Sequence, residues 1–217
     1  MPEKILIIGK NSNIAKEFLE MVGPEYQILK PSKKQWNMEN LNFSKEQNNF
    51  IKQSNRILLL QSVISDKKFI DRKDLDIIKQ IKVNLLSVIK ICEIALKFNK
   101  NVKIIVIGSE SGIKGSHDIS YALTKTSIHK YVEEKRISHP NQQLLCIAPS
   151  TIVDTGITLR RHDQNNVRRS IQDNPKKRGI LSKEIAKLIF SLFFEQSNYL
   201  SNIVIRFDGG KFSRMKT

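Results

Sequence analysis

Three side chains within residues 103–130 could act together in proton transfer to or from a substrate oxygen. Tyr121 and Lys125 are four residues apart in a stretch that predicts a helix, so both project from one helix face, about a turn apart. A lysine in that place stabilises the phenolate form of the tyrosine by its charge, which brings the phenol closer to acid/base work at neutral pH. Ser109 precedes the helix and could donate a hydrogen bond to a substrate oxygen as negative charge develops on it.

The same spacing has an ordinary interpretation. A tyrosine and a lysine one turn apart are also a common pair on a solvated helix surface, and the pattern taken alone is a weak motif. The elements around these side chains must therefore decide between a surface pair and a catalytic pair.

A strand and a loop are expected to hold Ser109. Residues 103–107 are a short run of isoleucine and valine, which is typical of a strand buried on both faces of a parallel sheet. The run ends in Gly108-Ser109-Glu110-Ser111-Gly112, whose small residues let the chain open into a loop beyond the carboxyl end of the strand. That edge is where open α/β sheets bind ligands.

The N-terminal residues predict a nucleotide-binding turn. Residues 4–8 form an apolar strand, Gly9 breaks it, and a helix is expected from about Ile14 to Val22. A strand, a glycine turn and a helix N-terminus bind a dinucleotide pyrophosphate through free N–H groups and the helix dipole. Only one of the usual three glycines is present, so a plain strand-to-helix turn is the alternative. The candidate phosphate-binding residues are Gly9, Asn11, Ser12, Asn13 and Ile14, with Ser12 or Asn13 as the helix cap.

The exit of the second strand predicts which dinucleotide binds. Residues 26–29 form this strand, and the chain leaves it through Lys30-Pro31-Ser32-Lys33-Lys34. A carboxylate here would bind the adenosine ribose hydroxyls and select NAD, whereas basic residues can accept a 2′-phosphate. Because this stretch has no acid, we expect NADP(H) to be favoured, with NAD(H) as the alternative. The candidate residues at this end of the site are Ser32, Lys33 and Asn37.

The rest of the chain alternates strands and helices. Strands are expected at residues 56–61, 143–148 and 202–207, and a short helix is expected within residues 37–51. Further helices are expected from Asp71 or Asp74 to about Phe98 and from a cap at Ser182 to Phe194. Residues 151–178 are polar and form a long excursion from the sheet. The pattern predicts an α/β fold with a doubly wound, Rossmann-type parallel sheet of about seven strands flanked by helices. We expect a single domain over residues 1–217, with a substrate-covering excursion at about 151–180.

Composition narrows the class of protein. Of the 217 residues 40% are hydrophobic, and no apolar run reaches the roughly 18 residues that would span a bilayer. The N-terminus lacks the pattern of a secretion signal, so we expect a cytoplasmic protein without a membrane partner. Cys92 and Cys146 have no metal-like spacing and are expected to be buried thiols. The net charge of +16 could attract nucleic acid, but lysine is spread along the whole chain and no nucleic-acid-binding motif is visible, so we do not expect that partner.

The order of these features resembles the short-chain dehydrogenase/reductase superfamily over residues 5–210. That family has a glycine-rich turn, an Asn in the fourth helix, a Ser before Y-x-x-x-K, a Pro-Gly after the next strand and a terminal Asp-Gly-Gly. The residues here that match in order are Asn84, Ser109, Tyr121, Lys125, Pro149, Thr155 and Asp208-Gly209-Gly210. The resemblance implies that Tyr121 is the acid/base and that Lys125 holds the nicotinamide ribose. It also implies that Ser109 polarises the substrate carbonyl and that Asn84 holds a water linking Lys125 to solvent.

Three departures from the family pattern concern the cofactor. Asn13 and Ala15 replace the second and third glycines of the turn, Ser150 follows Pro149, and residues 61–64 replace the usual Asn-Asn-Ala-Gly. Small residues at positions 15 and 150 still leave room for a cofactor, with an altered local geometry. The resemblance implies cofactor contacts at Gly9, Asn11, Ser12, Asn13, Ile14, Ser32, Lys33, Asn37, Gln61, Ser62, Tyr121, Lys125, Pro149, Ser150, Ile152 and Thr155.

These features favour an NAD(P)-dependent oxidoreductase that interconverts a secondary alcohol and a ketone on a small-molecule substrate. The competing function is a catalytically weak dinucleotide-binding regulatory protein or partner subunit, which the altered glycine turn suggests.

Two features of the sequence concern the substrate and the assembly. Arginine is concentrated in the excursion, which favours an anionic substrate such as a nucleotide-activated sugar or an acyl group on a phosphopantetheine carrier. Solvated surface charge is the alternative. The basic residues of the excursion are Arg160, Arg161, His162, Arg168, Arg169, Lys176, Lys177 and Arg178.

The helices over about 74–98 and from Tyr121 carry more apolar residues than one sheet face covers, which predicts a homodimer or homotetramer. In the family these two helices form the dimer interface.

Overall fold

The computed structural model describes residues 2–160 and 163–212, and its centre is a parallel β-sheet. Over these residues the sheet has six strands, one fewer than the approximate number predicted, and they correspond to the six strand segments expected from the sequence. The excursion after β5 adds an isolated bridge between Ile152 and Ile180. The spatial order is β2-β1-β3-β4-β5-β6. The strands are β1 (Lys4–Ile8), β2 (Gln27–Leu29), β3 (Arg56–Leu59), β4 (Lys103–Ile107), β5 (Gln143–Pro149) and β6 (Ile203–Phe207).

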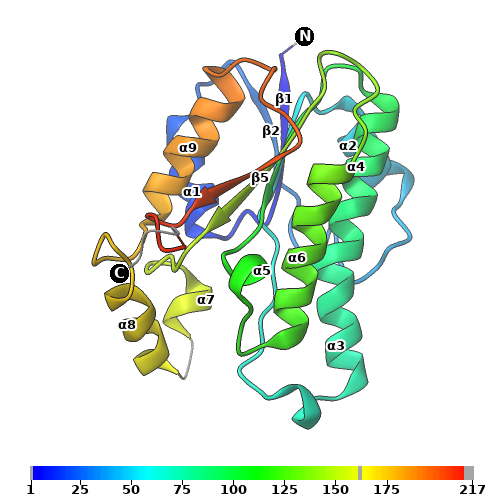
Figure 1. Cartoon of the computed structure of the whole chain (residues 1–217). Helices are drawn as coiled ribbons and strands as arrows, with labels where there is room; N and C mark the ends of the chain where they lie inside the picture. Colours follow the sequence, from blue (N-terminus) through cyan, green and yellow to red (C-terminus); the bar gives the residue numbers. More distant parts are fainter. Residues whose placement is uncertain (1, 161–162, 213–217) are drawn as a thin grey trace.

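Helices cover both faces of this sheet, as a doubly wound fold requires (Figure 1). α1 (Asn13–Met21) and α9 (Ser182–Phe194) lie side by side on one face, where the rings of Phe18 and Phe193 meet edge to face with centroids 6.0 Å apart. α2 (Lys45–Gln53), α4 (Ser87–Phe98) and α6 (Ile119–Glu134) cover the other face. Each face of the sheet packs against its helices in a hydrophobic core, and successive residues of β1 point into opposite cores. Ile5 packs with α1 and α9, whereas Leu6 packs with the helices on the other face.

The long helix predicted up to Phe98 is interrupted near its middle. It consists of α3 (Asp74–Ile81), a five-residue π-helical segment η2 (Lys82–Leu86), and α4. Such a π segment inserts an extra residue into the helical hydrogen-bond pattern and is frequent at functional sites. Asn84 lies in it and is buried.

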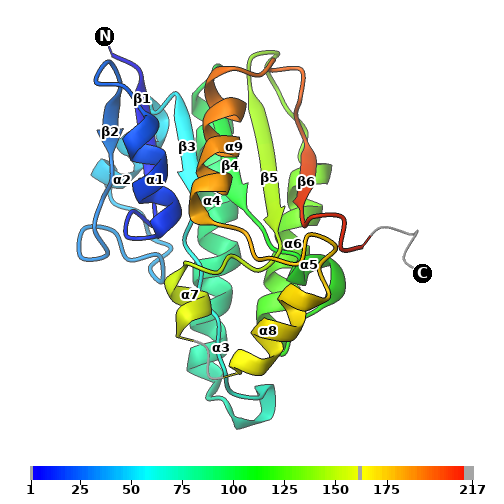
Figure 2. The same cartoon turned by 90° about the vertical axis from the view of Figure 1, so that its left-hand side faces the viewer.

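Short helical elements gather beyond the carboxyl ends of the strands (Figure 2). A 3₁₀ turn, η1 (Phe69–Asp71), precedes α3, and α5 (Ser111–Lys114) follows β4. The excursion after β5 contains α7 (Gly156–Leu159) and α8 (Gln164–Gln172), which the polar sequence did not reveal.

Ser182 does not cap α9 as predicted. It is the first residue of the helix, and both its N–H and its hydroxyl donate to the carboxylate of Asp154, with Oγ 2.8 Å from Oδ1. The capping acceptor therefore comes from a residue 28 positions earlier in the chain.

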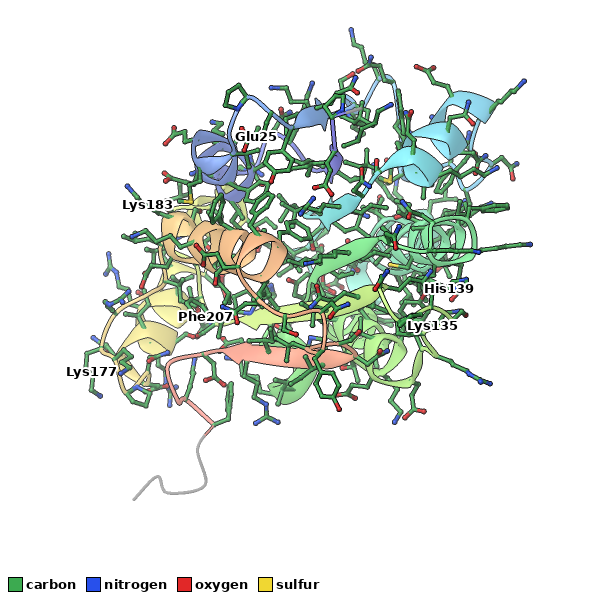
Figure 3. The ribbon with its side chains drawn as sticks, turned by 90° about the horizontal axis from the view of Figure 1, so that it is seen from above. Glu25, Lys135, His139, Lys177, Lys183 and Phe207 are labelled. Atoms are coloured by element: carbon green, nitrogen blue, oxygen red, sulfur yellow. The ribbon has the colours of Figure 1, made fainter. Side chains whose placement is uncertain are left out.

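The positive charge is distributed around the molecule. Lys135 lies on the side opposite Lys177 and Lys183 when the molecule is seen from above (Figure 3). Among the helices of the described residues, none is long and apolar enough to cross a membrane.

Candidate active site

A cleft of about 590 Å³ opens at the carboxyl edge of the sheet. Its walls are formed by the segments that follow β1, β3, β4 and β5, together with side chains from α6 and α7. The order of the strands reverses between β1 and β3, and ligands of open α/β sheets bind outside the strand ends at such a point.

The turn after β1 is built for a close approach of the backbone. Gly9 has φ +93°, and a Cβ atom there would lie 3.0 Å from the backbone of Leu60 and Gln61, so a side chain would be both strained and crowded. Ser12 is the cap of α1, because its Oγ accepts a hydrogen bond from the N–H of Ala15 at 3.1 Å. The N-terminus of α1 thus faces the cleft, where its dipole favours a negative group.

Asn13 lines the cleft, but its amide nitrogen is engaged with the backbone oxygen of Asp154. Asp154 in turn binds the start of α9. The asparagine that replaces a glycine of the family pattern therefore ties the turn to the excursion.

Orphaned polar atoms mark one end of the cleft. The indole N–H of Trp36, both amide atoms of Gln61 and the hydroxyl of Ser62 are buried and have no hydrogen-bond partner in the part of the chain that the structure describes. All three residues line the cleft. Buried polar groups are seldom left unpaired, so these atoms fit a polar ligand such as a dinucleotide.

The exit of β2 reaches the same end of the cleft. Lys33 and Asn37 line the cleft, whereas the lining does not include Ser32, whose hydroxyl accepts from the N–H of Gln35 at 3.3 Å. Glu39 also lines the cleft and pairs with Lys33 at 3.7 Å and with Lys79 at 3.1 Å. The prediction of an acid-free strand exit missed this carboxylate, because it follows the strand by ten residues.

Tyr121, Lys125 and Ser109 meet at the wall of the cleft. Tyr121 and Lys125 are both buried on α6, and the Nζ of Lys125 lies 5.6 Å from the centroid of the tyrosine ring. The same Nζ donates to the backbone oxygen of Ile107 at 2.7 Å, which fixes the ammonium next to the end of β4. A buried positive charge in this position can stabilise negative charge on the phenol oxygen.

A buried ion pair holds the start of α6. Asp118 caps the helix by accepting from the N–H of Tyr121 at 3.1 Å, and its Oδ1 lies 3.2 Å from Nη1 of Arg72. Burial raises the pKa of Asp118, but hydrogen bonds from Gln80, Ser120 and two backbone N–H groups outweigh burial and lower the pKa below its usual value. The carboxylate is therefore charged at neutral pH and anchors the helix that carries the tyrosine.

His129 is a site residue that the sequence reasoning missed. It is buried under the loop after β4, and its Nε2 accepts from the N–H of Ser109 at 3.4 Å. A Cβ atom at Gly108 or Gly112 would come within 2.4 or 2.6 Å of its ring, so both glycines are needed for it to fit. Burial, and then the charges of Lys125 and Arg206, lower the pKa of His129 to about 4. The sequence signal that could have identified His129 is its position on α6, one turn after Lys125.

Asn84 supports the site from outside, since the lining of the cleft does not include it. Its amide oxygen accepts from the N–H of Val63 at 2.8 Å, and its amide nitrogen donates to the oxygen of Val63 at 2.7 Å. The side chain thus fixes the segment after β3 that contains Gln61 and Ser62. The water-holding role implied by the family resemblance stays a prediction.

The segment after β5 forms the remaining wall. Pro149, Ser150, Ile152 and Thr155 line the cleft, as do Asn11 and Ile14 opposite. The predicted basic run divides in the structure: Arg160 lines the cleft, whereas Arg178 forms a two-pronged pair with Glu184 at 2.7 Å per bond. Arg161 and His162 lie outside the described residues.

Comparison with known proteins identifies the fold that carries this site. Neither a protein-family model nor a curated protein matches the chain. Among solved structures, the chain is similar to a short-chain dehydrogenase family protein from Francisella tularensis subsp. tularensis SCHU S4, with 18% identity, a TM-score of 0.82, and 97% of this chain and 99% of that chain covered.

Two further similar structures contain a bound dinucleotide. ElxO with NADP bound is 21% identical, with a TM-score of 0.81 and coverage of 99% of this chain and 100% of that chain. A 3-oxoacyl (acyl-carrier-protein) reductase from Agrobacterium tumefaciens C58 with NADP bound is 16% identical, with a TM-score of 0.77 and coverage of 95% of this chain and 93% of that chain. The chain therefore has the fold of short-chain dehydrogenase/reductase structures.

Proposed function

We propose that the protein is an NAD(P)-dependent oxidoreductase that interconverts a secondary alcohol and a ketone. The observation that carries this proposal is the convergence of Tyr121, Lys125 and Ser109 at the wall of a cleft with orphaned polar atoms. A helix-surface pair would be solvated, whereas Tyr121 and Lys125 are buried against the end of β4. The nicotinamide cofactor, when bound, supplies or accepts the hydride.

The side chains have distinct roles in this proposal. Tyr121 gives its phenolic proton to the substrate oxygen during reduction and takes a proton back during oxidation. Lys125 stabilises the phenolate and holds the nicotinamide ribose. Ser109 donates a hydrogen bond to the same substrate oxygen, and His129 orients it through the backbone N–H. Asn84 keeps the segment after β3 in place.

The proposed cofactor is NADP(H), with NAD(H) as the alternative. Lys10 and Lys33 both line the cleft and can approach a 2′-phosphate, and two similar structures hold NADP. Glu39 pairs with Lys33 and Lys79, which reduces the free positive charge at this end. The residues that would contact the cofactor are Gly9, Asn11, Ser12, Ile14, Lys33, Asn37, Gln61, Ser62, Pro149, Ser150, Ile152 and Thr155, which all line the cleft.

The proposed assembly is a homodimer or homotetramer joined through α3, η2 and α6. Leu75 is 76% exposed and Leu123 is 60% exposed, and Ile78, Leu86 and Ile119 add further apolar surface on the same helices. Apolar patches of this kind commonly mark protein–protein contacts.

The proposed place of action is the cytoplasm. Cys92 and Cys146 are both buried free thiols, and thiols persist in a reducing compartment.

A catalytically weak dinucleotide-binding regulator is the second candidate. The observation that favours it is the altered turn, in which Asn13 is engaged with Asp154 and is not free for a ligand. One experiment separates the two functions. Thermal stabilisation by NADPH or NADH tests binding, and turnover of a panel of ketones tests catalysis. Stabilisation without turnover would favour the regulator, and the absence of both would reject the two candidates together.

A further inference from the structure

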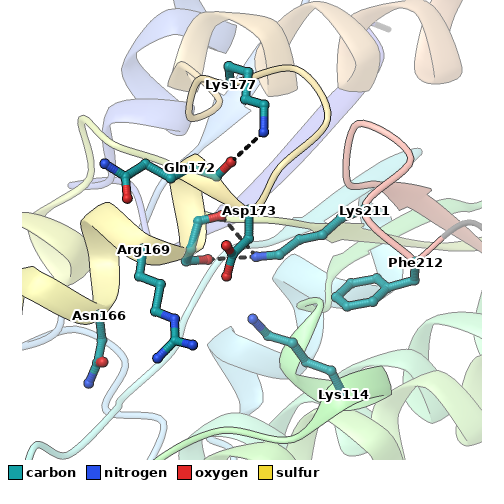
Figure 4. A pocket seen from close by; sticks show the side chains of 9 residues that line it. Lys114, Asn166, Arg169, Gln172, Asp173, Lys177, Lys211 and Phe212 are labelled. Atoms are coloured by element: carbon teal, nitrogen blue, oxygen red, sulfur yellow. Dashed lines mark hydrogen bonds between the residues drawn. The ribbon is translucent and has the colours of Figure 1, made fainter. Parts of the chain in front are cut away.

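A second cavity of about 690 Å³ lies beside the cleft. It is open to solvent and is bordered by α8, by α5 and by the turn after β6 (Figure 4). Four of its lining side chains are cationic, namely Lys114, Arg169, Lys177 and Lys211, and among the described residues Asp173 is the carboxylate that lines it. The cavity is therefore positively charged on balance, although the surface around it is mixed.

The cationic side chains come from separate elements and extend into the same cavity. Figure 4 shows Lys114 rising from α5, Arg169 descending from α8 and Lys211 entering from the turn after β6. Lys211 is only 5% exposed, and its Nζ donates to the hydroxyl of Ser170 at 2.7 Å. Burial lowers the pKa of Lys211, the carboxylate of Glu110 acts in the opposite direction, and the charge of Lys114 lowers the pKa further.

The ion pairs of this region leave some positive charge available. Glu110 forms ion pairs with both lysines, since its Oε1 lies 2.8 Å from the Nζ of Lys114 and its Oε2 lies 3.5 Å from the Nζ of Lys211. Arg169 forms no ion pair or hydrogen bond through its side chain within residues 2–160 and 163–212. An unpaired arginine at a cavity can bind a phosphate with two parallel hydrogen bonds.

We propose that this cavity is a phosphate-binding subsite, formed by Lys114, Arg169 and Lys211. It lies close to the reaction site because α5 follows the Ser109 loop directly. Ser111 at the start of α5 lines the cleft, and Lys114 at its end lines the second cavity. A carbonyl compound bound at Ser109 could thus place a phosphate of its more distant part against Lys114 and Arg169. The phosphate is either part of the substrate or a free ion. Only the first source rests on the proposed function.

The helix α8 offers a matched control. Arg168 and Arg169 are neighbours, both are exposed, and of the two only Arg169 lines the cavity. Arg168→Gln and Arg169→Gln change the net charge of the protein equally, so any difference between them reports on the cavity. Lys114→Gln tests the same space from α5.

The test is a titration with inorganic pyrophosphate, followed by calorimetry, with NADPH present to fill the phosphate site of the cleft. We expect saturable binding to wild type and to Arg168→Gln with equal Kd, and binding weakened about tenfold to a hundredfold in Arg169→Gln and Lys114→Gln. Equal weakening by Arg168→Gln would mean general charge screening and would overturn the proposal. Absence of saturable binding to wild type would overturn it as well.

A second pair of probes separates the two sources of phosphate. Acetoacetyl coenzyme A and ethyl acetoacetate share a reducible carbonyl and differ in the phosphate-bearing group. If the subsite holds a substrate phosphate, Arg169→Gln raises KM for the first compound and leaves KM for the second unchanged. If KM changes for neither while pyrophosphate binding is lost, the subsite takes free phosphate. Because the titration requires no turnover, a failure of the oxidoreductase proposal would be seen separately, as a lack of NADPH-dependent reduction.

Discussion

Replacing Asp118 with Asn should destabilise the protein strongly, because it breaks a buried ion pair and leaves Arg72 without its counter-charge. The side chains of Arg72 and Asp118 are 3% and 1% exposed. The carboxylate also accepts hydrogen bonds from Gln80 at 2.6 Å, from Ser120 at 2.7 Å and from the N–H of Ser65 at 2.8 Å. An amide keeps the shape of the side chain but cannot accept at both ends.

The expected magnitude follows from the burial of the pair. Removing one partner of a buried ion pair costs about 3–5 kcal/mol, since it leaves an uncompensated charge. Arg72 retains hydrogen bonds to Gln80 and Ser120, so we expect the lower end, about 3 kcal/mol. For a chain of this size that corresponds to a fall in Tm of roughly 6–12 °C.

The assay is urea and thermal unfolding of wild type, Asp118→Asn and the control Asp71→Asn. Asp71 is an exposed carboxylate in the same segment as Arg72, so its replacement should change stability by no more than about 0.5 kcal/mol. A loss below about 1 kcal/mol for Asp118→Asn would refute the reasoning, because the pair would then contribute no more than a surface ion pair.

The contribution of Asp118 to stability should depend on pH in a defined direction. The pKa of Asp118 is lower in the folded protein than its ordinary value of 3.8, so its contribution to stability is complete above that value and is lost as the pH falls through the folded-state pKa. The difference in stability between wild type and Asp118→Asn should therefore be constant from pH 5 to 7 and shrink below about pH 4. A difference that grows as the pH falls would contradict this assignment.

Three other predictions concern the cofactor end, the serine loop and the assembly. Replacing Lys33 and Lys34 with Ala should weaken NADPH binding and leave NADH binding nearly unchanged, as measured by fluorescence titration; equal effects on both would reject recognition of the 2′-phosphate. His129→Leu should lower kcat about tenfold and leave the Kd for NADPH unchanged, because the N–H of Ser109 loses its acceptor. Since the folded-state pKa of His129 is depressed to about 4, wild type should lose stability as the pH falls from about 6.5 towards 4, and His129→Leu should lose less. Light scattering at micromolar concentration should give at least a dimer, and Leu123→Glu should shift it to a monomer; a wild-type monomer would reject the proposed interface.

The sequence predicted the sheet well because its strands are short, continuous apolar runs. The run at residues 103–107, for example, is buried as expected and is β4. The six strand segments named from the sequence correspond to the six strands of the sheet, so the approximate count of seven was one too high. The two short helices of the excursion, α7 and α8, were not predicted. Polarity alone cannot distinguish an exposed helix from a loop.

The site was predictable only where a pattern lies within one element. The spacing of Tyr121 and Lys125 put both side chains on one face of α6. Contacts between distant residues were not accessible in this way: Arg72 and Asp118 are 46 positions apart, and Asn84 binds the backbone of a residue 21 positions away. Glu39 was missed for the same reason, because only the folded chain brings it to the cleft. His129 has a signal within one element, its position one turn after Lys125, but its contact with Ser109 appears only in the folded chain.

The measurement that tests the central claim most directly is a paired assay on Tyr121→Phe. Binding of NADPH is measured by fluorescence titration, and reduction of a ketone panel is measured by the loss of NADPH absorbance. The change removes a proton donor and little volume, so the Kd for NADPH should stay within about twofold of wild type while turnover of every ketone that wild type reduces is lost. Turnover by Tyr121→Phe close to that of wild type would contradict the assignment of Tyr121 as the acid/base.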